Sequence, residues 1–332
     1  MLRIHFTDAD LAQVRVARGP DPCWETVLGL QQLTCPSHPT VYAPWRRRTR
    51  AELADRQLCA AAARLTTLAP ARSVYFPDFL TPAESAEGLG AALGALRSTP
   101  ATRLYAELAA LHRLAPRPNR GDGWMRSSAC AGPRQLDELA DIIRALHAAV
   151  IEPDWTRVAC GVDTDRAVKA RALRDGGVHG LLGSLRPMAC WRPPVLHVNY
   201  PVDRDLHLRG RGLHLIPSYF CWRTAVAPAD PDLPPVLVYP VPHDSGPAPR
   251  PPALSALLGR TRARVLAALE SAISNSELAS CLELSAASVS EHTKALREAR
   301  LADRRRENGY VVHTLTPLGA ALLHGELPAG ER

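Results

Sequence analysis

The sequence lacks the features of a membrane or secreted protein. No apolar run is long enough to span a bilayer, so we expect no transmembrane helix. Asp8 and Asp10 fall within the first ten residues and no apolar stretch follows them, so we expect no signal peptide. The eight cysteines include no C-x-x-C pair, which favours reduced, mostly buried thiols and a cytoplasmic location.

The sequence also lacks the motifs of the common enzyme classes. It contains no G-x-S-x-G nucleophile turn, no Walker loop and no G-x-G-x-x-G. Gly176, Gly177 and Gly180 fall in an expected loop, not between a strand and a phosphate-binding helix. We therefore expect no enzymatic activity, no catalytic residue and no cofactor.

Lysine is scarce, and basic charge is concentrated near the C-terminus. Only Lys169 and Lys294 are lysines among 40 basic residues, and the net charge of +7 favours a polyanionic partner. From residue 254 onward, ten basic and nine acidic residues nearly balance. Between residues 294 and 306, however, six basic residues face only two acidic ones, which predicts a local basic surface.

The first part of the chain, 1–245, is predicted to be a mostly helical domain with a small antiparallel sheet. Helical patterns cover 8–16, 22–33, 50–68, 82–97, 101–114, 134–151 and 154–174. Strand patterns cover 1–7, 195–200, 205–208, 212–216 and 236–241. The proline-rich segment 246–253 is expected to be a linker to a second domain, 254–326.

Several side chains of the first domain are candidates for a metal site or for acid–base chemistry. His197, His207 and His214 could converge on a metal ion, but no acidic or cysteine partner has ligand spacing, so no metal site is expected. Asp163 and Asp165 could serve in acid–base chemistry, but they lie in a helical pattern and are expected to face water.

Aromatic and basic residues of this domain are expected to have structural roles. The basic run 45–50 is a phosphate contact or a solvated helix start, and the second is favoured. The six tryptophans are expected in the core rather than around an effector; they are Trp24, Trp45, Trp124, Trp155, Trp191 and Trp222.

The sequence patterns that identify the fold of the second domain begin at residue 274. Ser274 and Glu277 have the spacing of a capping box, which predicts the start of a short helix. Ser285 can cap a second helix, in which Val289, Thr293 and Leu296 recur at i, i+4 and i+7 and should point inward. Two short helices joined this tightly predict a helix-turn-helix.

The following residues predict a hairpin and another helix. Strand-like residues 302–306 and 310–315 flank Asn308-Gly309, the strongest short hairpin turn. Thr316-Pro317 then predicts a helix to His324, and an apolar stripe over 254–270 predicts a supporting helix. This order is that of a winged helix-turn-helix, so the predicted fold class is α+β with a C-terminal winged helix.

Residues 254–324 resemble the winged helix of ArsR-type bacterial transcription regulators, with MarR-type regulators next. The matching residues are Leu258-Gly259-Arg260-Thr261-Arg262-Ala263-Arg264-Val265-Leu266, Glu277-Leu278-Ala279, Val289-Ser290-Glu291-His292, Leu296-Arg297-Glu298-Ala299 and Leu315-Thr316-Pro317-Leu318-Gly319. The remainder resembles the long N-terminal part of actinobacterial regulators of this group. Glu283 and Arg300 depart from the family by standing where glycine is common, and Cys281 lacks the partner cysteine of metal-sensing members.

The resemblance implies a DNA interface on the recognition helix, 286–300, and an arginine-rich wing, 302–315. The expected DNA-binding residues are Ala287, Ser288, Ser290, Glu291, Lys294, Arg297, Arg304, Arg305, Arg306 and Asn308. Ser288, Ser290 and Glu291 would contact base edges, whereas Lys294 and Arg297 would contact phosphates.

These features lead to one functional hypothesis and one alternative. The protein is expected to be a sequence-specific DNA-binding regulator, a dimeric repressor on a palindromic operator, with 1–245 as the dimerisation or effector-response domain. Double-stranded DNA, a second copy and a small-molecule effector are its expected partners, and a membrane is not. Alternatively, the N-terminal domain is a ligand receptor or enzyme, and the winged helix is a tether or a protein-interaction module.

Overall fold

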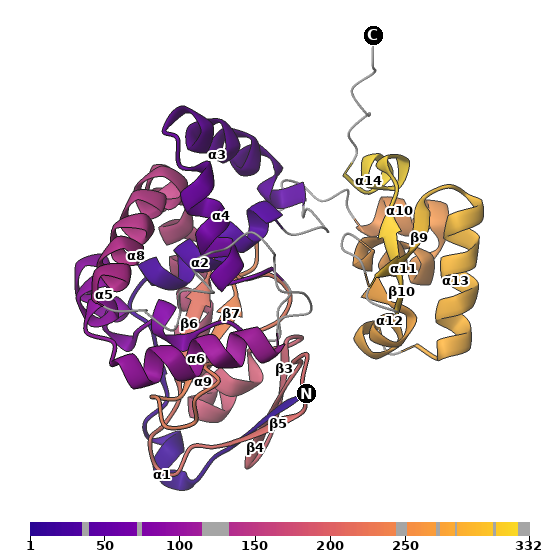
Figure 1. Cartoon of the computed structure of the whole chain (residues 1–332). Coiled ribbons are helices and arrows are strands. Elements are labelled where there is room, and N and C mark those ends of the chain that lie inside the picture. The colour runs from indigo at the N-terminus through magenta and orange to yellow at the C-terminus, as the bar shows by residue number, and fades with distance from the viewer. Residues whose placement is uncertain are drawn as a thin grey trace. The chain divides into compact units, whose positions relative to one another are not determined.

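Two compact units make up the chain in the computed structural model shown in Figure 1. The N-terminal unit consists of Met1–Cys35 and Trp45–His243, and the C-terminal unit of Pro36–Pro44 and Asp244–Arg332. The structure describes every residue except 35–39, 72–74, 115–132, 244–250, 270–272, 283, 308–309 and 325–332. The described residues form a mixed α/β structure in which helices predominate and the sheets are small.

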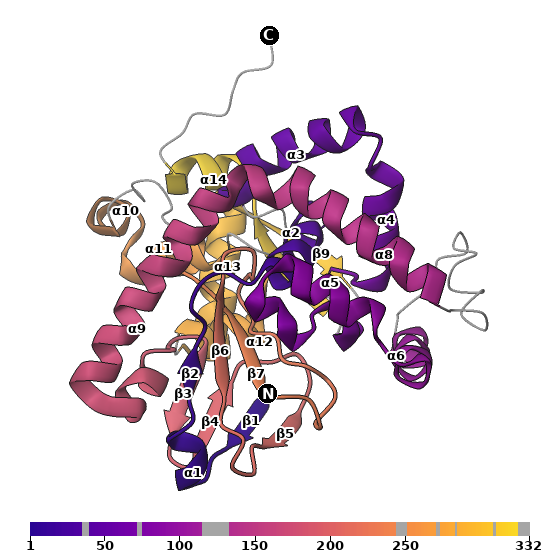
Figure 2. The same ribbon diagram turned by 90° about the vertical axis from the view of Figure 1, so that its left-hand side faces the viewer.

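The first sheet of the N-terminal unit places the earliest strand between two late ones. Its order is β3-β4-β1-β5, formed by Ala189–Arg192, Val195–Val198, Leu2–His5 and Arg204–His207 (Figure 2). Strand β1 is antiparallel to β4 and parallel to β5. Its side chains alternate, so Leu2 and Ile4 are 0% exposed in the core while Arg3 and His5 lie on the opposite face.

The second sheet is parallel and has the order β2-β6-β7. Its strands are Arg15–Val16, His214–Ser218 and Val236–Pro240. The expected small antiparallel sheet is therefore right for β3, β4 and β1 but wrong for the other strands, because β1 pairs parallel with β5 and the second sheet is parallel. An alternating pattern identifies a strand but not its direction, and the long connection 219–235 lets the chain re-enter the sheet from the same end.

Helices surround these sheets and share one core with them. They are α1 Asp8–Leu11, α2 Pro22–Thr34, α3 Ala43–Asp55, α4 Cys59–Leu68, α5 Leu89–Arg97, α6 Ala101–Leu114, α8 Pro133–Leu146 and α9 Trp155–Gly183, and a π-helical turn, His147–Ile151, follows α8. Leu181 and Leu182 of α9 pack in one cluster with Leu196 of the first sheet and Leu215 of the second. The two sheets therefore belong to a single folded unit.

Local backbone geometry explains where the helices depart from their predicted bounds. The predicted helix 50–68 is interrupted between α3 and α4, where Gln57 has a φ of 59°. Helix α9 continues past residue 174 and reverses at Gly177, which has a φ of 60°. A Cβ at Gly180 would press on the carbonyl oxygen of Ala172, so the reversed segment needs glycine there. The loop expected around these glycines is thus a helical reversal.

Buried carboxylates join the helices to the segments that follow the strands. Glu25 of α2 is 0% exposed and accepts hydrogen bonds from the backbone N–H groups of Tyr219 and Phe220 and from the Ser218 hydroxyl. Burial raises the pKa of Glu25 to about 7, and these hydrogen bonds oppose part of that rise. Asp78 similarly accepts the N–H groups of Ala229 and Asp230.

The basic run at 45–50 lies in α3 and is packed into the unit. Trp45 is 3% exposed and its Nε1 donates to the carbonyl oxygen of Val150 at 3.0 Å. Arg46 is 6% exposed, and Arg48 forms an ion pair with Asp154. The expectation of a solvated helix start is therefore wrong for Trp45 and Arg46, whereas Arg47, Arg48 and Arg50 are exposed.

The C-terminal unit contains helices and one three-stranded antiparallel sheet with the order β8-β10-β9. Its elements are α10 Pro251–Leu258, α11 Arg260–Ala268, β8 Ile273–Ser274, α12 Asn275–Leu282, α13 Ala286–Glu298, β9 Ala302–Glu307, β10 Tyr310–Leu315 and α14 Pro317–His324. Helix α10 begins inside the predicted linker 246–253. The single helix expected over 254–270 is broken at Gly259, whose φ is 81°.

The described residues bear on the expected absence of a membrane span and on the expected burial of the cysteines. No helix within the described ranges is long and apolar enough to cross a membrane. Cys23 and Cys221 are buried, whereas Cys59 and Cys160 are exposed and Cys190 is intermediate. The expectation of mostly buried thiols is therefore wrong for these five cysteines.

Candidate nucleic-acid interface

Helix α13 is fixed to its unit by one cap and three inward-facing side chains. The Ser285 hydroxyl accepts the backbone N–H of Ser288 at 3.1 Å, as its sequence position predicts. Val289, Thr293 and Leu296 are exposed by 0%, 2% and 2%, and their inward orientation is confirmed. The Thr293 hydroxyl donates to the carbonyl oxygen of Val289, so its polar atom is satisfied inside the core. One face of α13 is thus committed to packing.

Helix α12 precedes α13 and contacts it through polar atoms as well as through the core. Leu278 and Val289 belong to the same buried cluster. The Asn275 side-chain amide donates to the Ser290 hydroxyl at 3.3 Å. Ser290 is exposed but engaged at its hydroxyl, a contact that helical periodicity alone does not predict. The Glu277 side chain and residue 283 lie outside the described structure, so the capping box and the turn residue stay predictions.

The outward face of α13 is polar and carries charges of both signs. Ala287, Ser290, Glu291 and Lys294 are exposed, whereas Ser288 and Arg297 are half-buried. Lys294 lies 3.9 Å from Glu298, a distance typical of a weak solvent-exposed pair. Arg297 has its Nε enclosed without a hydrogen-bond partner.

The end of α13 is locked to the start of α14. Arg300 has a φ of 56°, which for a residue with a Cβ costs about 1 kcal/mol. The Thr316 hydroxyl donates to the carbonyl oxygen of Arg300 at 2.6 Å and accepts the N–H of Gly319 at 3.0 Å. A Cβ on Gly319 would overlap with the carbonyl oxygen of Leu301, so this crossing requires glycine.

The hairpin after α13 divides its arginines between two faces. Strands β9 and β10 pair antiparallel, with Arg304 opposite His313 and Arg305 opposite Val312. Ala302 lies in the core, so alternation puts Arg304 on the same face of the strand as Ala302 and Arg305 on the opposite face, and both arginines are exposed. Contact of this arginine run with DNA stays a prediction. The Arg306 side chain and Asn308 lie outside the described structure.

His313 is the residue of this region that the sequence interpretation missed. It is 3% exposed, and neither ring nitrogen has a hydrogen-bond partner. Burial lowers its pKa, and the positive charges of Arg297 and Arg304 lower that pKa further. The period-two pattern of the strand could have placed its side chain on the inner face, but not shown that it lacks a partner.

The histidines weighed as metal ligands do not converge. His197 and His207 lie in the first sheet, whereas His214 lies in the second. The ring of His207 stacks on that of His5, with centroids 4.3 Å apart. Within the part of the chain that is described, no three His, Cys, Asp or Glu side chains are arranged to hold a metal ion.

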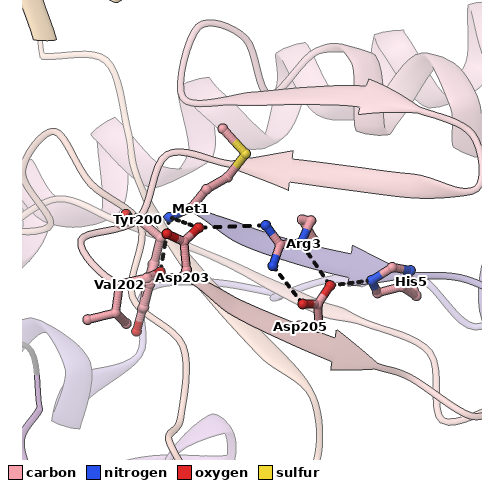
Figure 3. A network of polar contacts seen from close by, with 7 residues as sticks. All are labelled: Met1, Arg3, His5, Tyr200, Val202, Asp203 and Asp205. Carbon is pink, nitrogen blue, oxygen red and sulfur yellow. Dashed lines mark hydrogen bonds and ion pairs between the residues drawn. The ribbon is translucent and has the colours of Figure 1, made fainter. Parts of the chain in front are cut away.

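The side chains around this histidine pair are engaged with one another (Figure 3). Asp205 accepts from Arg3 Nε at 2.8 Å and Nη2 at 2.6 Å, and lies 2.7 Å from His5 Nε2. These contacts, led by the Arg3 hydrogen bonds, lower the pKa of the Asp205 carboxyl. The Asp205 carboxylate is therefore engaged by Arg3 and His5, and Asp203 pairs with Met1 N and Arg3 beside it.

The two aspartates considered for acid–base chemistry have opposite surroundings. Asp163 is exposed and pairs with Arg166 at 2.7 Å. Asp165 is only 3% exposed, accepts the Tyr239 hydroxyl at 2.6 Å and lies 3.5 Å from Lys169 Nζ. The expectation that both face water is therefore wrong for Asp165, which helps to join α9 to β7.

The tryptophans vary in burial. Trp24 and Trp45 are in the core, as expected. Trp155, Trp191 and Trp222 are half-buried, so the expectation of core positions is wrong for them. Trp124 lies outside the described residues. Each half-buried ring contacts a histidine ring in a tilted or edge-on arrangement, as Trp191 does with His179, whose centroids lie 5.7 Å apart.

Comparisons with known proteins found no relative of this chain. No family model, no curated protein and no solved structure matches the chain.

Proposed function

We propose that the C-terminal unit is a winged helix-turn-helix that binds duplex DNA, with α13 in the major groove. The observation that carries this proposal is the division of α13 into two faces. Val289, Thr293 and Leu296 hold it against the core, and the opposite face is polar, with short side chains near its N-terminal end and Lys294 and Arg297 further along. A helix of this kind fits the width of the major groove, and its small side chains allow close approach to base edges.

The outward residues of α13 divide into two proposed roles. Ala287, Ser290 and Glu291 would lie at base edges, where Glu291 could accept from a cytosine amino group. Ser288 would take part as a half-buried neighbour. Lys294 and Arg297 would contact phosphates and so position the helix without reading sequence.

The hairpin β9–β10 would act as the wing. Arg304, on the face shared with His313, would contact the DNA backbone next to α13. Arg305 faces the other way, so it would contribute less. Arg306 and Asn308 keep their predicted place in the wing on sequence grounds alone.

Specific recognition by so small a unit favours a two-fold dimer on a palindromic site. We propose that the N-terminal unit serves dimerisation or the response to an effector, and that binding represses transcription, as in the ArsR-type regulators which the C-terminal sequence resembles. The polar face of α13 supports DNA binding, whereas dimerisation and repression follow from the resemblance.

Selection of duplexes from a random pool by the purified full-length protein tests DNA binding. Recovery of one enriched, roughly palindromic sequence, protected from hydroxyl radicals over two half-sites, is the expected result. Failure to enrich any sequence would contradict the proposal. Capture of a metabolite or a protein partner under the same conditions would favour the alternative in which the winged helix is a tether or an interaction module.

The salt dependence of binding to the selected duplex tests the wing. Arg304→Ala should reduce the slope of log K against log salt by about one unit, because one phosphate contact is lost. Arg305→Ala is the matched control on the neighbouring position and should leave the slope nearly unchanged. Equal slopes for the Arg304 variant and the wild type would show that the wing does not contact DNA.

A further inference from the structure

Three side chains from three elements of the C-terminal unit interact electrostatically where α13 adjoins the hairpin. Arg297 comes from α13, Arg304 from β9 and His313 from β10. Arg304 and His313 are paired in register across the two strands. Both arginines act on the imidazole electrostatically, and within the described residues neither forms an ion pair with a carboxylate.

The imidazole in this cluster is enclosed without a partner. His313 is 3% exposed and both of its nitrogens lack hydrogen bonds, as does Nε of Arg297. Buried polar groups are normally hydrogen-bonded, so an unpartnered ring beside two cations calls for an explanation. An apolar side chain in its place would avoid the loss of hydration.

The acidic side chains described on α13 and β9 are Glu291, Glu298 and Asp303, and all three are exposed. Glu298 Oε1 lies 3.9 Å from Lys294 Nζ, and the Asp303 carboxylate accepts the backbone N–H of Arg304. Strand β8, which pairs with β10, contributes Ile273 and Ser274, and neither titrates near neutral pH. The described side chains of α12 include Asn275, Leu278 and Leu282, which carry no charge. The charges that act on His313 are therefore the cations of α13 and β9.

We propose that Arg297 and Arg304 hold one backbone phosphate of the bound duplex, and that His313 beneath them takes up a proton from solvent when that phosphate arrives. The proposal rests on DNA binding by the C-terminal unit. In the free protein the two guanidinium charges oppose protonation of the ring. A phosphate on these arginines cancels part of their field, so the imidazolium form becomes favourable. No covalent bond changes, and the proton comes from the buffer.

Proton uptake of this kind makes DNA affinity depend on pH. Where the free protein has lost the proton and the complex retains it, one linked proton changes affinity by up to about tenfold per pH unit. Affinity therefore increases as pH falls. The pH range is set by the histidine and not by the arginines, which stay charged throughout.

The test uses the full-length protein and a labelled duplex recovered by the selection described above. Fluorescence anisotropy gives Kd at constant salt between about pH 6 and pH 8.5, where histidines titrate. The wild type should bind several-fold more tightly at the acidic end, and His313→Gln should abolish most of that dependence. His292→Gln removes another histidine of the same unit, on α13, and should retain the wild-type dependence.

Calorimetry in two buffers of different ionisation enthalpy measures the same proton directly. The wild type should take up a fraction of one proton on binding, and His313→Leu should take up none. A pH-independent wild type, or a His313 variant with the wild-type dependence, would overturn the inference while DNA binding stands. If no duplex is bound at any pH, the proposed function fails and this inference with it.

Discussion

Two buried polar side chains, Glu25 in the N-terminal unit and His313 in the C-terminal unit, differ in their hydrogen bonding. In the N-terminal unit, Glu25 is fully enclosed but accepts hydrogen bonds from Ser218, Tyr219 and Phe220. In the C-terminal unit, His313 is almost as deeply enclosed and has none. The carboxylate joins a helix to the segment after β6, whereas the imidazole stabilises nothing through hydrogen bonds.

The difference in hydrogen bonding between Glu25 and His313 affects the stability of the folded units. A buried polar group left without a hydrogen bond costs about 1–3 kcal/mol. Glu25 avoids much of that cost, so its role is explained by folding alone. His313 does not, and its pKa is lowered by the charges of the two arginines that we propose bind phosphate. Stability sacrificed at a basic surface is therefore a better guide to function here than the polar clusters of the larger unit.

Removal of the Glu25 carboxylate should have the largest effect on stability. Glu25→Ala leaves two backbone N–H groups and a hydroxyl unpaired in the core, and should destabilise the N-terminal unit by about 3 kcal/mol or more. Denaturant unfolding followed by tryptophan fluorescence measures the loss. Glu87→Gln, at an exposed carboxylate, is the control and should change little. A loss below that of an ordinary surface substitution would show that Glu25 does not hold this junction together.

A substitution at Gly319 should destabilise the other unit. Gly319→Ala places a Cβ against the carbonyl oxygen of Leu301, and overpacking of this kind costs about 1–3 kcal/mol. We expect hydrogen exchange to accelerate in α13, α14 and the hairpin. Exchange in α2 should stay unchanged. Gly90→Ala is the control, because a Cβ there meets open space. Faster exchange throughout the chain would contradict the division into two units.

The pH dependence of unfolding should reflect Glu25. The folded-state pKa is raised to about 7 from an ordinary value of 4.5, so the folded unit binds the proton more tightly than the unfolded chain. This contribution is fully present below 4.5 and lost as pH rises through 7. The free energy of unfolding should therefore increase by at most about 3 kcal/mol on acidification over that window.

Glu25→Gln is the matched variant for this measurement and should flatten the pH dependence. Asp78, whose pKa burial raises to about 6, acts in the same direction and leaves a residual slope. A wild-type protein that loses stability steadily from pH 7 to pH 5 would contradict the assignment.

The smallest expected change in stability is in the C-terminal unit, at His313. His313→Leu removes two unpartnered nitrogens from the interior and should stabilise that unit by about 1 kcal/mol. Thermal unfolding of the full-length variant should show a modest increase in Tm. Glu25 offers the opposite case, because the same kind of replacement there must destabilise. A clear decrease in Tm for His313→Leu would mean that the imidazole has a structural role.

The local pattern in the sequence predicted the C-terminal elements well. The i, i+4, i+7 spacing of Val289, Thr293 and Leu296 identifies the buried face of α13, and Ser285 marks its start. The strands on either side of Asn308-Gly309 were also predicted. Gly259 was missed as a helix break, because a single glycine inside an apolar stripe also occurs within helices.

Long-range relations were what the sequence could not provide. Alternation predicted β1, β4 and β5 but not that β1 pairs parallel with one and antiparallel with the other. The charge pattern identified Arg304 and Arg305 together, and only the register separated their faces. His313 was missed because the absence of a hydrogen-bond partner depends on side chains distant in sequence.

The central place of β1 in its sheet has a consequence for biosynthesis. This strand leaves the ribosome early, yet its hydrogen-bonding neighbours, β4 and β5, are translated only near the end of the unit. Contacts of such high sequence separation form slowly, and an unpaired strand with one apolar face is prone to aggregation until its partners are made. Nascent chains that stall before Arg204 should accordingly depend on chaperones far more than chains that stall after His243.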